Sequence, residues 1–201
     1  MFADRLALVE RYVAWLAGAG IERGLMGPRE VPRLWGRHVL NCAVVTEAIP
    51  RGASVVDLGS GAGLPGLVIA LRRPDVRVTL VEPLLRRTTF LSEVVADLGL
   101  DHVDVHRGRA EDLHGRATFD VVTSRALAPL SRLVGWSVPL VAPGGAVIAM
   151  KGSSAEDEVV AARGVLRTAA RGFEVAVDDL VSTVPGVDPI RVIRMHRPSG
   201  G

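Results

Sequence analysis

The sequence predicts an α/β protein whose mainly parallel sheet is covered by helices on both faces. From Gly52 onward, short runs of β-branched and aliphatic residues alternate with segments of helical periodicity, as in sheets whose strands are joined by helices. The last two strand-like runs, Phe173–Val181 and Ile190–His196, flank a turn at Pro185-Gly186 and predict an antiparallel C-terminal pair. With 201 residues, of which 48% are hydrophobic and 23% charged, the chain can bury a sizeable core, so we expect one domain over residues 1–201.

The first 51 residues predict a helical cap that precedes the sheet. A first helix is indicated by apolar residues at helical spacing, namely Leu6, Val9, Val13 and Leu16. A second helix through about Ala48 is indicated by a stripe that includes Val31, Leu34, Trp35, His38, Cys42 and Val45. Two helices of this length are too small to form an independent domain.

Strands and helices are then expected in alternation. The strands are expected at Ser54–Leu58, Arg77–Val81, His102–His106, Phe119–Thr123 and Ala146–Met150. The helices are expected from Pro65 onward and over Leu84–Leu98, Leu127–Leu140 and Ala155–Thr168. Pro65 suits a first helical position, because the amide that proline lacks would be unpaired there.

The composition excludes several classes of protein. The single cysteine, Cys42, cannot form an internal disulfide, and no Cys/His spacing fits a zinc site, so we expect no metal and a reducing, cytoplasmic compartment. The uncharged stretch Leu133–Met150 is broken by glycine and proline, and the charged first residues do not fit a signal peptide, so we expect no membrane association. The net charge of +2 permits nucleic-acid binding without requiring it.

A glycine-rich turn follows the first expected strand. The segment reads Asp57-Leu-Gly-Ser-Gly-Ala-Gly-Leu-Pro-Gly66, with glycines at Gly59, Gly61 and Gly63. Glycines between a strand and a helix let the backbone turn sharply and approach a ligand closely. The carboxylate of Asp57 would attract a cationic ammonium and repel a pyrophosphate. The turn therefore predicts a binding site for a ligand that carries a positively charged group.

An acidic residue, Glu82, follows the second expected strand. A carboxylate at this place can accept hydrogen bonds from both hydroxyls of a ribose. Asp57 and Glu82 together describe a nucleoside with an amino-acid-like end, and S-adenosylmethionine fits that description. An NAD-dependent oxidoreductase is disfavoured, because Asp57 would crowd a pyrophosphate and no Tyr-Lys hydride-transfer pair is evident.

The sequence then resembles a known family. Five segments are similar to the bacterial 16S ribosomal RNA guanine-7 methyltransferases, the RsmG or GidB family, in order and spacing: Arg37-His38, the turn from Asp57 to Gly66, Gly108-Arg-Ala-Glu111, Thr123-Ser-Arg-Ala126 and Met150-Lys-Gly152. The glycine turn alone would indicate only some methyltransferase. The Ser-Arg-Ala and Lys-Gly segments narrow the resemblance to this family.

The resemblance implies a fold, a reaction and a set of site residues. The fold would be a Rossmann-like, class I S-adenosylmethionine-dependent methyltransferase, and the reaction methylation of nitrogen 7 of a guanosine in 16S ribosomal RNA. Gly59 and Leu64 would line the methionine and ribose side of the cofactor, and Ala110 and Glu111 would lie against adenine. The expected partner is 16S ribosomal RNA or the small ribosomal subunit, and the enzyme is expected to be a monomer.

Two cations are expected at the edge of the sheet where the cofactor would lie. Arg125 and Lys151 follow adjacent predicted strands, and Lys151 is the only lysine of the chain. A cation there suits a phosphate or the carbonyl oxygen of guanine. We therefore expect Arg125 and Lys151 to be catalytic, and the resemblance implies that Arg125 contacts the cofactor or the target base; surface salt bridges are the alternative interpretation of both residues.

RNA contacts are expected on the second helix of the cap. Arg29, Arg33 and Arg37 repeat every four residues and would share one helix face beside His38. A solvated face for the arginines and a core position for His38 remain the simpler interpretations. Two other functions also stay open: methylation of another RNA or a small substrate, and a ribosome-assembly module that binds the cofactor without catalysis.

Overall fold

A seven-stranded sheet forms the centre of the protein. The computed structural model describes residues 1–200. The strand order is β3-β2-β1-β4-β5-β7-β6, in which the pairs among β1 to β5 are parallel and β7 is antiparallel to both of its neighbours. The strands are β1 (Ser54–Leu58), β2 (Arg77–Glu82), β3 (Val103–Arg107), β4 (Phe119–Arg125), β5 (Val141–Lys151), β6 (Glu174–Leu180) and β7 (Ile190–His196). The predicted fold class, including the antiparallel C-terminal pair, is confirmed.

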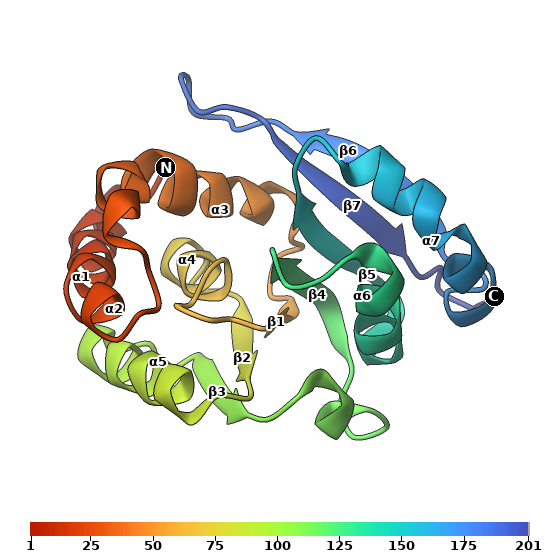
Figure 1. The fold of residues 1–201 in the computed structure, drawn as a ribbon, viewed down its shortest axis with the longest axis horizontal. Coiled ribbons are helices and arrows are strands. Elements are labelled where there is room, and N and C mark those ends of the chain that lie inside the picture. The colour runs from red at the N-terminus through yellow and green to blue at the C-terminus, as the bar shows by residue number, and fades with distance from the viewer. Residues whose placement is uncertain (201) are drawn as a thin grey trace.

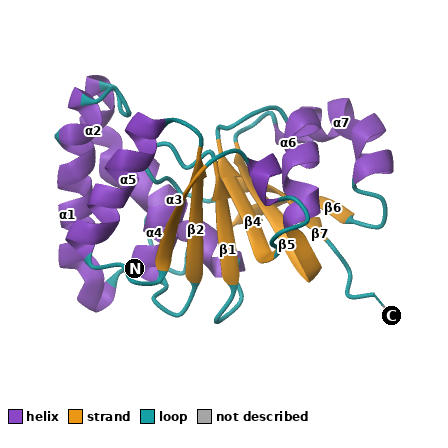
Figure 2. Cartoon of the chain, turned by 90° about the horizontal axis from the view of Figure 1, so that it is seen from below, coloured by secondary structure: helices purple, strands orange, loops and turns teal. Residues whose placement is uncertain are grey.

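Helices cover both faces of the sheet (Figure 1). The α-helices are α1 (Leu6–Ala17), α2 (Ala19–Glu22), α3 (Asn41–Val44), α4 (Gly66–Arg72), α5 (Leu85–Leu98), α6 (Leu130–Ser137) and α7 (Ala155–Ala169). Helices α1, α3, α4 and α5 pack on one face, and α6 and α7 pack on the other (Figure 2). Neighbouring residues of β1 alternate between the two cores: Val55 belongs to the first and Val56 to the second.

The N-terminal cap shares the first of these cores with the sheet. Val9 and Tyr12 of α1 are fully buried, and so are Ala43 and Val44 of α3. No helix in the described part of the chain is long and apolar enough to cross a membrane. Residues 1–200 also contain no group of three or more His, Cys, Asp or Glu side chains that could hold a metal ion.

The second helix of the cap differs from the expected regular α-helix. The structure has a 3-10 helix at Pro28–Arg33, a π-helix at Leu34–Leu40, the short α3 and a second 3-10 helix at Val45–Ala48. Pro32 lies inside the first of these segments and has no amide hydrogen to donate. The expectation that Arg29, Arg33 and Arg37 share one face of a regular helix is therefore wrong.

Several element boundaries differ from the expected ones, as three examples show. Helix α6 begins at Leu130 instead of 127, because Pro129 precedes it and residues 126–129 form a loop. Strand β5 begins at Val141 instead of Ala146, and a bulge opposite β4 accommodates the extra residues. Pro65 precedes the first residue of α4 instead of being that residue.

Candidate cofactor and RNA site

The glycine turn lies between β1 and α4 and is held by the neighbouring strand. The amides of Gly59 and Ser60 both donate to the carbonyl of Val81 at the end of β2, at 2.8 and 3.1 Å. Gly63 has a φ of +99°, and a Cβ there would collide with Leu67 and lie 3.0 Å from the hydroxyl of Tyr12. Gly63 therefore cannot carry a side chain without rearranging the packing of the turn.

Asp57 lies beneath this turn and is fully buried. Its Oδ2 accepts a hydrogen bond from the amide of Gly66 at 3.0 Å, which ties the end of β1 to the start of α4. Its Oδ1 is buried and has no hydrogen-bond partner among residues 1–200. Burial raises the pKa of Asp57 to about 7, because a carboxylate is poorly solvated there.

Glu82 holds the other side of the turn and is 1% exposed. Its Oε2 accepts from the amide of Gly61 at 3.1 Å, and its Oε1 accepts from the amide of Leu84 at 3.1 Å. Arg87 of α5 places Nη1 3.3 Å from Oε2. These three contacts occupy three of the roughly four acceptor positions of a carboxylate, so one position remains free, on Oε1.

The residues expected beside adenine follow β3. Ala110 is buried at the start of a short 3-10 helix, Ala110–Leu113, and the neighbouring Glu111 is exposed. The amide of Gly108 donates to the carbonyl of Glu82 at 3.2 Å, so this segment is attached to the same edge as the acidic residue. Leu64, expected on the methionine side, is half-buried in the glycine turn.

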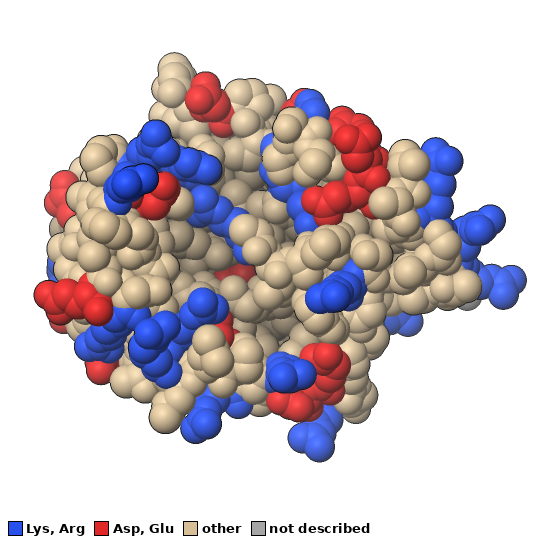
Figure 3. Space-filling view, viewed as in Figure 1, with Lys and Arg blue, Asp and Glu red and all other residues tan. Residues whose placement is uncertain are grey.

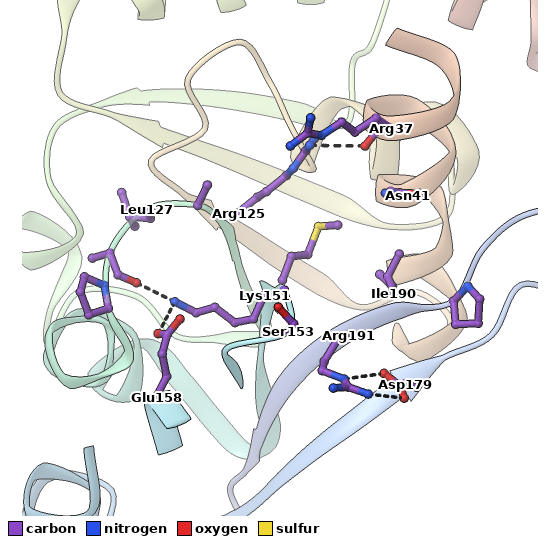
Figure 4. Close-up of a pocket in the computed structure, with 16 residues that line it drawn as sticks. Arg37, Asn41, Arg125, Leu127, Lys151, Ser153, Glu158, Asp179, Ile190 and Arg191 are labelled. Atoms are coloured by element: carbon purple, nitrogen blue, oxygen red, sulfur yellow. Dashed lines mark hydrogen bonds and ion pairs between the residues drawn. The ribbon is translucent and has the colours of Figure 1, made fainter. Parts of the chain in front are cut away.

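A cavity of about 1010 Å³ opens at the ends of β4 and β5 and is lined by residues from the cap, both strands and the C-terminal pair (Figure 4). Arg125 and Met150 are partners across the two strands, so Arg125 and Lys151 lie at the same edge, as predicted. Leu127 lines this cavity and also packs against the glycine turn, because a Cβ added to Gly59 would collide with the Leu127 side chain. The cavity therefore adjoins the turn.

Lys151 is held on one side of the cavity. Its side chain is 9% exposed, and Nζ lies 2.7 Å from both the carbonyl oxygen of Ala128 and Oε2 of Glu158. The same Glu158 oxygen accepts from the amide of Leu130 at 2.9 Å. Lys151 and Glu158 therefore fasten the loop before α6, and one ammonium hydrogen of Lys151 remains for another partner.

Arg125 is held on the other side, by the cap. Its Nη1 donates to Sγ of Cys42 at 3.4 Å, and its Nη2 lies 2.8 Å from Nδ1 of His38 and 3.4 Å from the carbonyl of Arg37. Burial raises the pKa of the Cys42 thiol to about 11, so this sulfur is a neutral, weak acceptor. Nε and one hydrogen of Nη1 have no hydrogen-bond partner in the described part of the chain.

The three arginines expected to contact RNA are all exposed. Arg37 lines the cavity, whereas Arg33 lies 3.9 Å from Glu30. His38, expected beside them, is only 8% exposed and faces Arg125 and Glu30 instead of solvent. In Figure 3, Lys and Arg side chains gather on the rim of a hollow in the face of the molecule that is viewed.

Comparison with known proteins places this geometry in a family. The sequence profile of GidB, described as rRNA small subunit methyltransferase G, matches residues 5–177. The chain belongs to this family. Ribosomal RNA small subunit methyltransferase G of Nocardioides sp. (strain ATCC BAA-499 / JS614) is 68% identical over 160 residues, which are 80% of this chain and 64% of that protein. The protein of the same name from Kineococcus radiotolerans is 53% identical over 203 residues, covering 98% of this chain and 79% of its own length.

Solved structures agree with the GidB assignment at the level of the fold. The S-adenosylmethionine-dependent methyltransferase SibL superposes with a TM-score of 0.61 at 22% identity, over 85% of this chain and 57% of SibL. A putative rRNA-methylase from Clostridium thermocellum superposes with a TM-score of 0.56 at 18% identity, over 79% of this chain and 94% of that protein. The expected family is confirmed by the profile match and the class I methyltransferase fold by these superpositions, and membership of the methyltransferase family supports S-adenosylmethionine as the cofactor.

The edge of the sheet in this GidB member fits S-adenosylmethionine chemically. Two buried carboxyl groups flank the glycine turn. Oδ1 of Asp57 has no hydrogen-bond partner within residues 1–200, and a cationic ligand would supply a donor and a compensating charge. Within residues 1–200 the carboxyl group of Asp57 is bonded to the amide of Gly66 and to no basic side chain, so the site offers little to a pyrophosphate. Glu82 keeps one acceptor position, on Oε1, for a ribose hydroxyl, and Ala110 lies just after the neighbouring strand β3.

Two contacts at the candidate site are not predictable from the sequence. Glu30 reaches His38 from within the cap, and Glu158 reaches Lys151 from α7. Neither acid belongs to a recognisable motif, because each pairs with a residue that the fold brings near it. The spacing of seven residues between Lys151 and Glu158 is the only sequence pattern that links such a pair. It does not predict the contact, because the same spacing is also found between residues that do not interact.

Proposed function

We propose that this protein transfers a methyl group from S-adenosylmethionine to nitrogen 7 of a guanosine in 16S ribosomal RNA. The observation that carries the proposal is the position of Arg125, whose unused N–H donors lie at a cavity beside the glycine turn of a GidB family member. The carbonyl oxygen of guanine, next to nitrogen 7, accepts hydrogen bonds from arginine. We also propose that residues 1–201 form one methyltransferase domain, since the cap and sheet share a core.

The proposed reaction does not require acid–base catalysis by the protein. Nitrogen 7 of guanine has an in-plane lone pair and attacks without losing a proton first, so no general base is needed. S-adenosylmethionine supplies a methyl group on a sulfonium, which leaves as a neutral thioether when the new bond forms. The residues of the chain therefore act mainly by orienting the reactants, an effect that contributes up to about 7–11 kcal/mol in well-aligned reactions.

Each group of residues has a separate part in this proposal. Asp57, Glu82 and the glycine turn hold the cofactor, with Gly59, Leu64, Ala110 and Glu111 around it. Arg125 orients the target base by bonding its carbonyl oxygen, and Lys151 secures the loop that borders the cavity. The base must leave its stack to enter, so the small ribosomal subunit would present it in a single-stranded segment.

The test is methyl transfer to small ribosomal subunits that lack the modification, followed by nucleoside analysis of the 16S RNA. We expect 7-methylguanosine at one position with wild-type protein. Arg125→Ala should lower the rate at least tenfold, whereas Arg163→Ala, on the exposed surface of α7, should leave it unchanged. Methylation of a different atom, or cofactor binding without methylation of any RNA, would favour one of the alternative functions instead.

A further inference from the structure

An unbroken chain of hydrogen bonds connects the cap to the end of β4. Oε2 of Glu30 lies 2.7 Å from Nε2 of His38, and Nδ1 of the same ring lies 2.8 Å from Nη2 of Arg125. His38 is 8% exposed, so both ring nitrogens are directed at protein groups instead of bulk water. The two contacts come from segments that are 8 and 87 residues away in sequence.

The chemistry of the two partners fixes the protonation of the ring. A guanidinium only donates hydrogen bonds, so Nδ1 must be an acceptor and carry no proton. The carboxylate of Glu30 only accepts, so Nε2 must carry the proton and donate. His38 is therefore a neutral imidazole in a single tautomer, and only that form makes both bonds.

The surrounding charges favour the neutral form. Burial lowers the pKa of His38, the cations Arg125 and Arg37 lower it further, and the hydrogen bond to Glu30 opposes them. The hydrogen bond from His38, with the nearby arginines, in turn lowers the pKa of Glu30, so Glu30 is ionised. The remaining group at Arg125 is the Cys42 thiol, which stays protonated at neutral pH.

We propose that His38 is a positioning residue, whose neutral ring holds the guanidinium of Arg125 at the edge of the cavity while Glu30 fixes the orientation of the ring. This inference rests on the proposed function, in which Arg125 orients the target base. With Nη2 bonded to His38 and Arg37, Nε and one hydrogen of Nη1 remain for the base. Protonation of Nδ1 would remove the acceptor and set two cations against each other.

Two substitutions separate the two nitrogens of His38. The amide of asparagine lies where Nδ1 lies, so His38→Asn keeps an acceptor for Arg125 and loses the bond to Glu30. The amide of glutamine lies where Nε2 lies, so His38→Gln keeps a donor to Glu30 and loses the acceptor. We expect His38→Asn to retain kcat/KM for RNA within about threefold, and His38→Gln to lose about tenfold or more, which corresponds to one lost hydrogen bond to a charged group.

The matched control is His102, a partly buried histidine whose Nε2 lies 3.1 Å from the carbonyl of Ala70, away from the cavity. His102→Asn and His102→Gln should both leave kcat/KM unchanged. Affinity for S-adenosylmethionine, measured for every variant, should stay near the wild-type value and shows that the fold is intact. Equal rates for His38→Asn and His38→Gln in proteins that bind the cofactor would overturn the proposal.

The pH dependence gives a second readout, which a purely structural role would not move. At S-adenosylmethionine concentrations that saturate the protein at every pH, so that the ionisation of Asp57 does not limit the rate, the wild-type rate should fall at acidic pH as His38 gains a proton. This acid limb should be missing from His38→Asn. An unchanged acid limb in that variant would contradict the proposal. A third readout needs no activity: ¹⁵N NMR of the histidine rings, with His38→Asn to assign the signal, should show a protonated Nε2 and a bare Nδ1.

These readouts keep the two hypotheses apart. If the wild-type protein methylates no RNA, the proposed function fails, and the tautomer measured by NMR still tests the arrangement of Glu30, His38 and Arg125. A protonated Nδ1 would overturn the inference whatever the activity. If both His38 variants fail to bind the cofactor, the tautomer and the acid limb of the wild-type protein decide the question.

Discussion

Tyr12 donates a hydrogen bond to the carbonyl of Ala62, and the two atoms are 2.8 Å apart. Tyr12 belongs to the first helix of the cap, and Ala62 lies in the middle of the glycine turn, fifty residues later. Both residues are buried, and burial raises the pKa of the Tyr12 hydroxyl well above its ordinary value, so it remains a donor. The cap therefore helps to shape the turn expected to hold the cofactor.

Replacing this hydroxyl should affect both stability and cofactor binding. In Tyr12→Phe the carbonyl of Ala62 loses its buried donor, so we expect the free energy of unfolding to fall by about 1–3 kcal/mol. Affinity for S-adenosylmethionine should fall with it, as measured by calorimetric titration. Trp15→Phe is the control, since it removes an exposed bond from the same helix to Asp97 and should not change the affinity. Unaltered affinity for S-adenosylmethionine in Tyr12→Phe would show that the glycine turn keeps its conformation without the hydrogen bond from Tyr12.

Asp57 should couple cofactor binding to pH. Without cofactor its pKa is raised to about 7, and a bound ammonium would lower it, so affinity should rise as the pH increases through 7 and then level off. Calorimetry in buffers of different ionisation heat should detect a proton released on binding. We expect Asp57→Ala to lower the affinity for S-adenosylmethionine tenfold or more, about 1.4 kcal/mol. If Asp57→Asn keeps normal affinity and wild type releases no proton on binding, Asp57 only supports the amide of Gly66.

The same group should affect the stability of the cofactor-free protein in the opposite direction. The pKa of Asp57 in the folded protein lies above its ordinary value of 3.8, so folding retains a proton that the unfolded chain releases. This contribution to stability is present below about pH 4 and is lost as the pH rises to about 7. The free energy of unfolding, measured with denaturant between about pH 4 and 7, should show this pH-dependent loss in wild type. The loss should be absent from Asp57→Asn, whose side chain does not titrate.

Glu82 should discriminate between cofactors by their ribose. Glu82→Gln keeps one acceptor oxygen and should lose less affinity for S-adenosylmethionine than Glu82→Ala, which also releases the amides of Gly61 and Leu84. A 2′-deoxy analogue should bind wild type more weakly than the cofactor does, and this difference should shrink in Glu82→Ala. If the two proteins are equally sensitive to the missing hydroxyl, the ribose is held elsewhere and Glu82 serves the turn alone.

Lys151 and Glu158 should act as one unit. Lys151→Ala should bind S-adenosylmethionine normally and methylate RNA poorly, and Glu158→Ala should do the same, because either change releases the loop that precedes α6. Each should also destabilise the protein by about 1.5–3 kcal/mol, and the double variant by little more than one single variant. Full activity in Glu158→Ala beside an inactive Lys151→Ala would indicate that the lysine contacts RNA itself.

The exposed arginines of the cap should contribute to the salt dependence of RNA binding. Replacing Arg29, Arg33 and Arg37 together should weaken binding and flatten its dependence on salt by up to about 0.7 log units for each lost contact with a single strand. The control carries the same change of charge at three exposed arginines on and just after α7, namely Arg163, Arg167 and Arg171. Equal salt slopes in the two triple variants would mean that the cap arginines form a solvated face.

The sequence predicts the part of the site that follows from strand order. Asp57 and Glu82 end neighbouring parallel strands, and such ends must meet at one edge, so their convergence on the glycine turn needs no knowledge of packing. The contacts of Arg125 depend instead on how the cap folds back over β4. Its π-helix turns His38 toward Arg125, and helical periodicity alone does not predict a π-helix. Long-range pairing of this kind is set by tertiary structure.

The strand order at the C-terminal edge has a consequence for how such enzymes diverge. The β6–β7 hairpin supplies Asp179, Ile190 and Arg191 to the wall of the cavity, whereas the glycine turn lies across β4 on the other half of the sheet. The GidB profile itself ends at residue 177, within β6. Under the proposed function, substitutions in the hairpin would therefore reshape the cavity expected to admit the substrate without disturbing the residues expected to hold the methyl donor, so that selectivity and cofactor use could evolve on separate parts of one sheet.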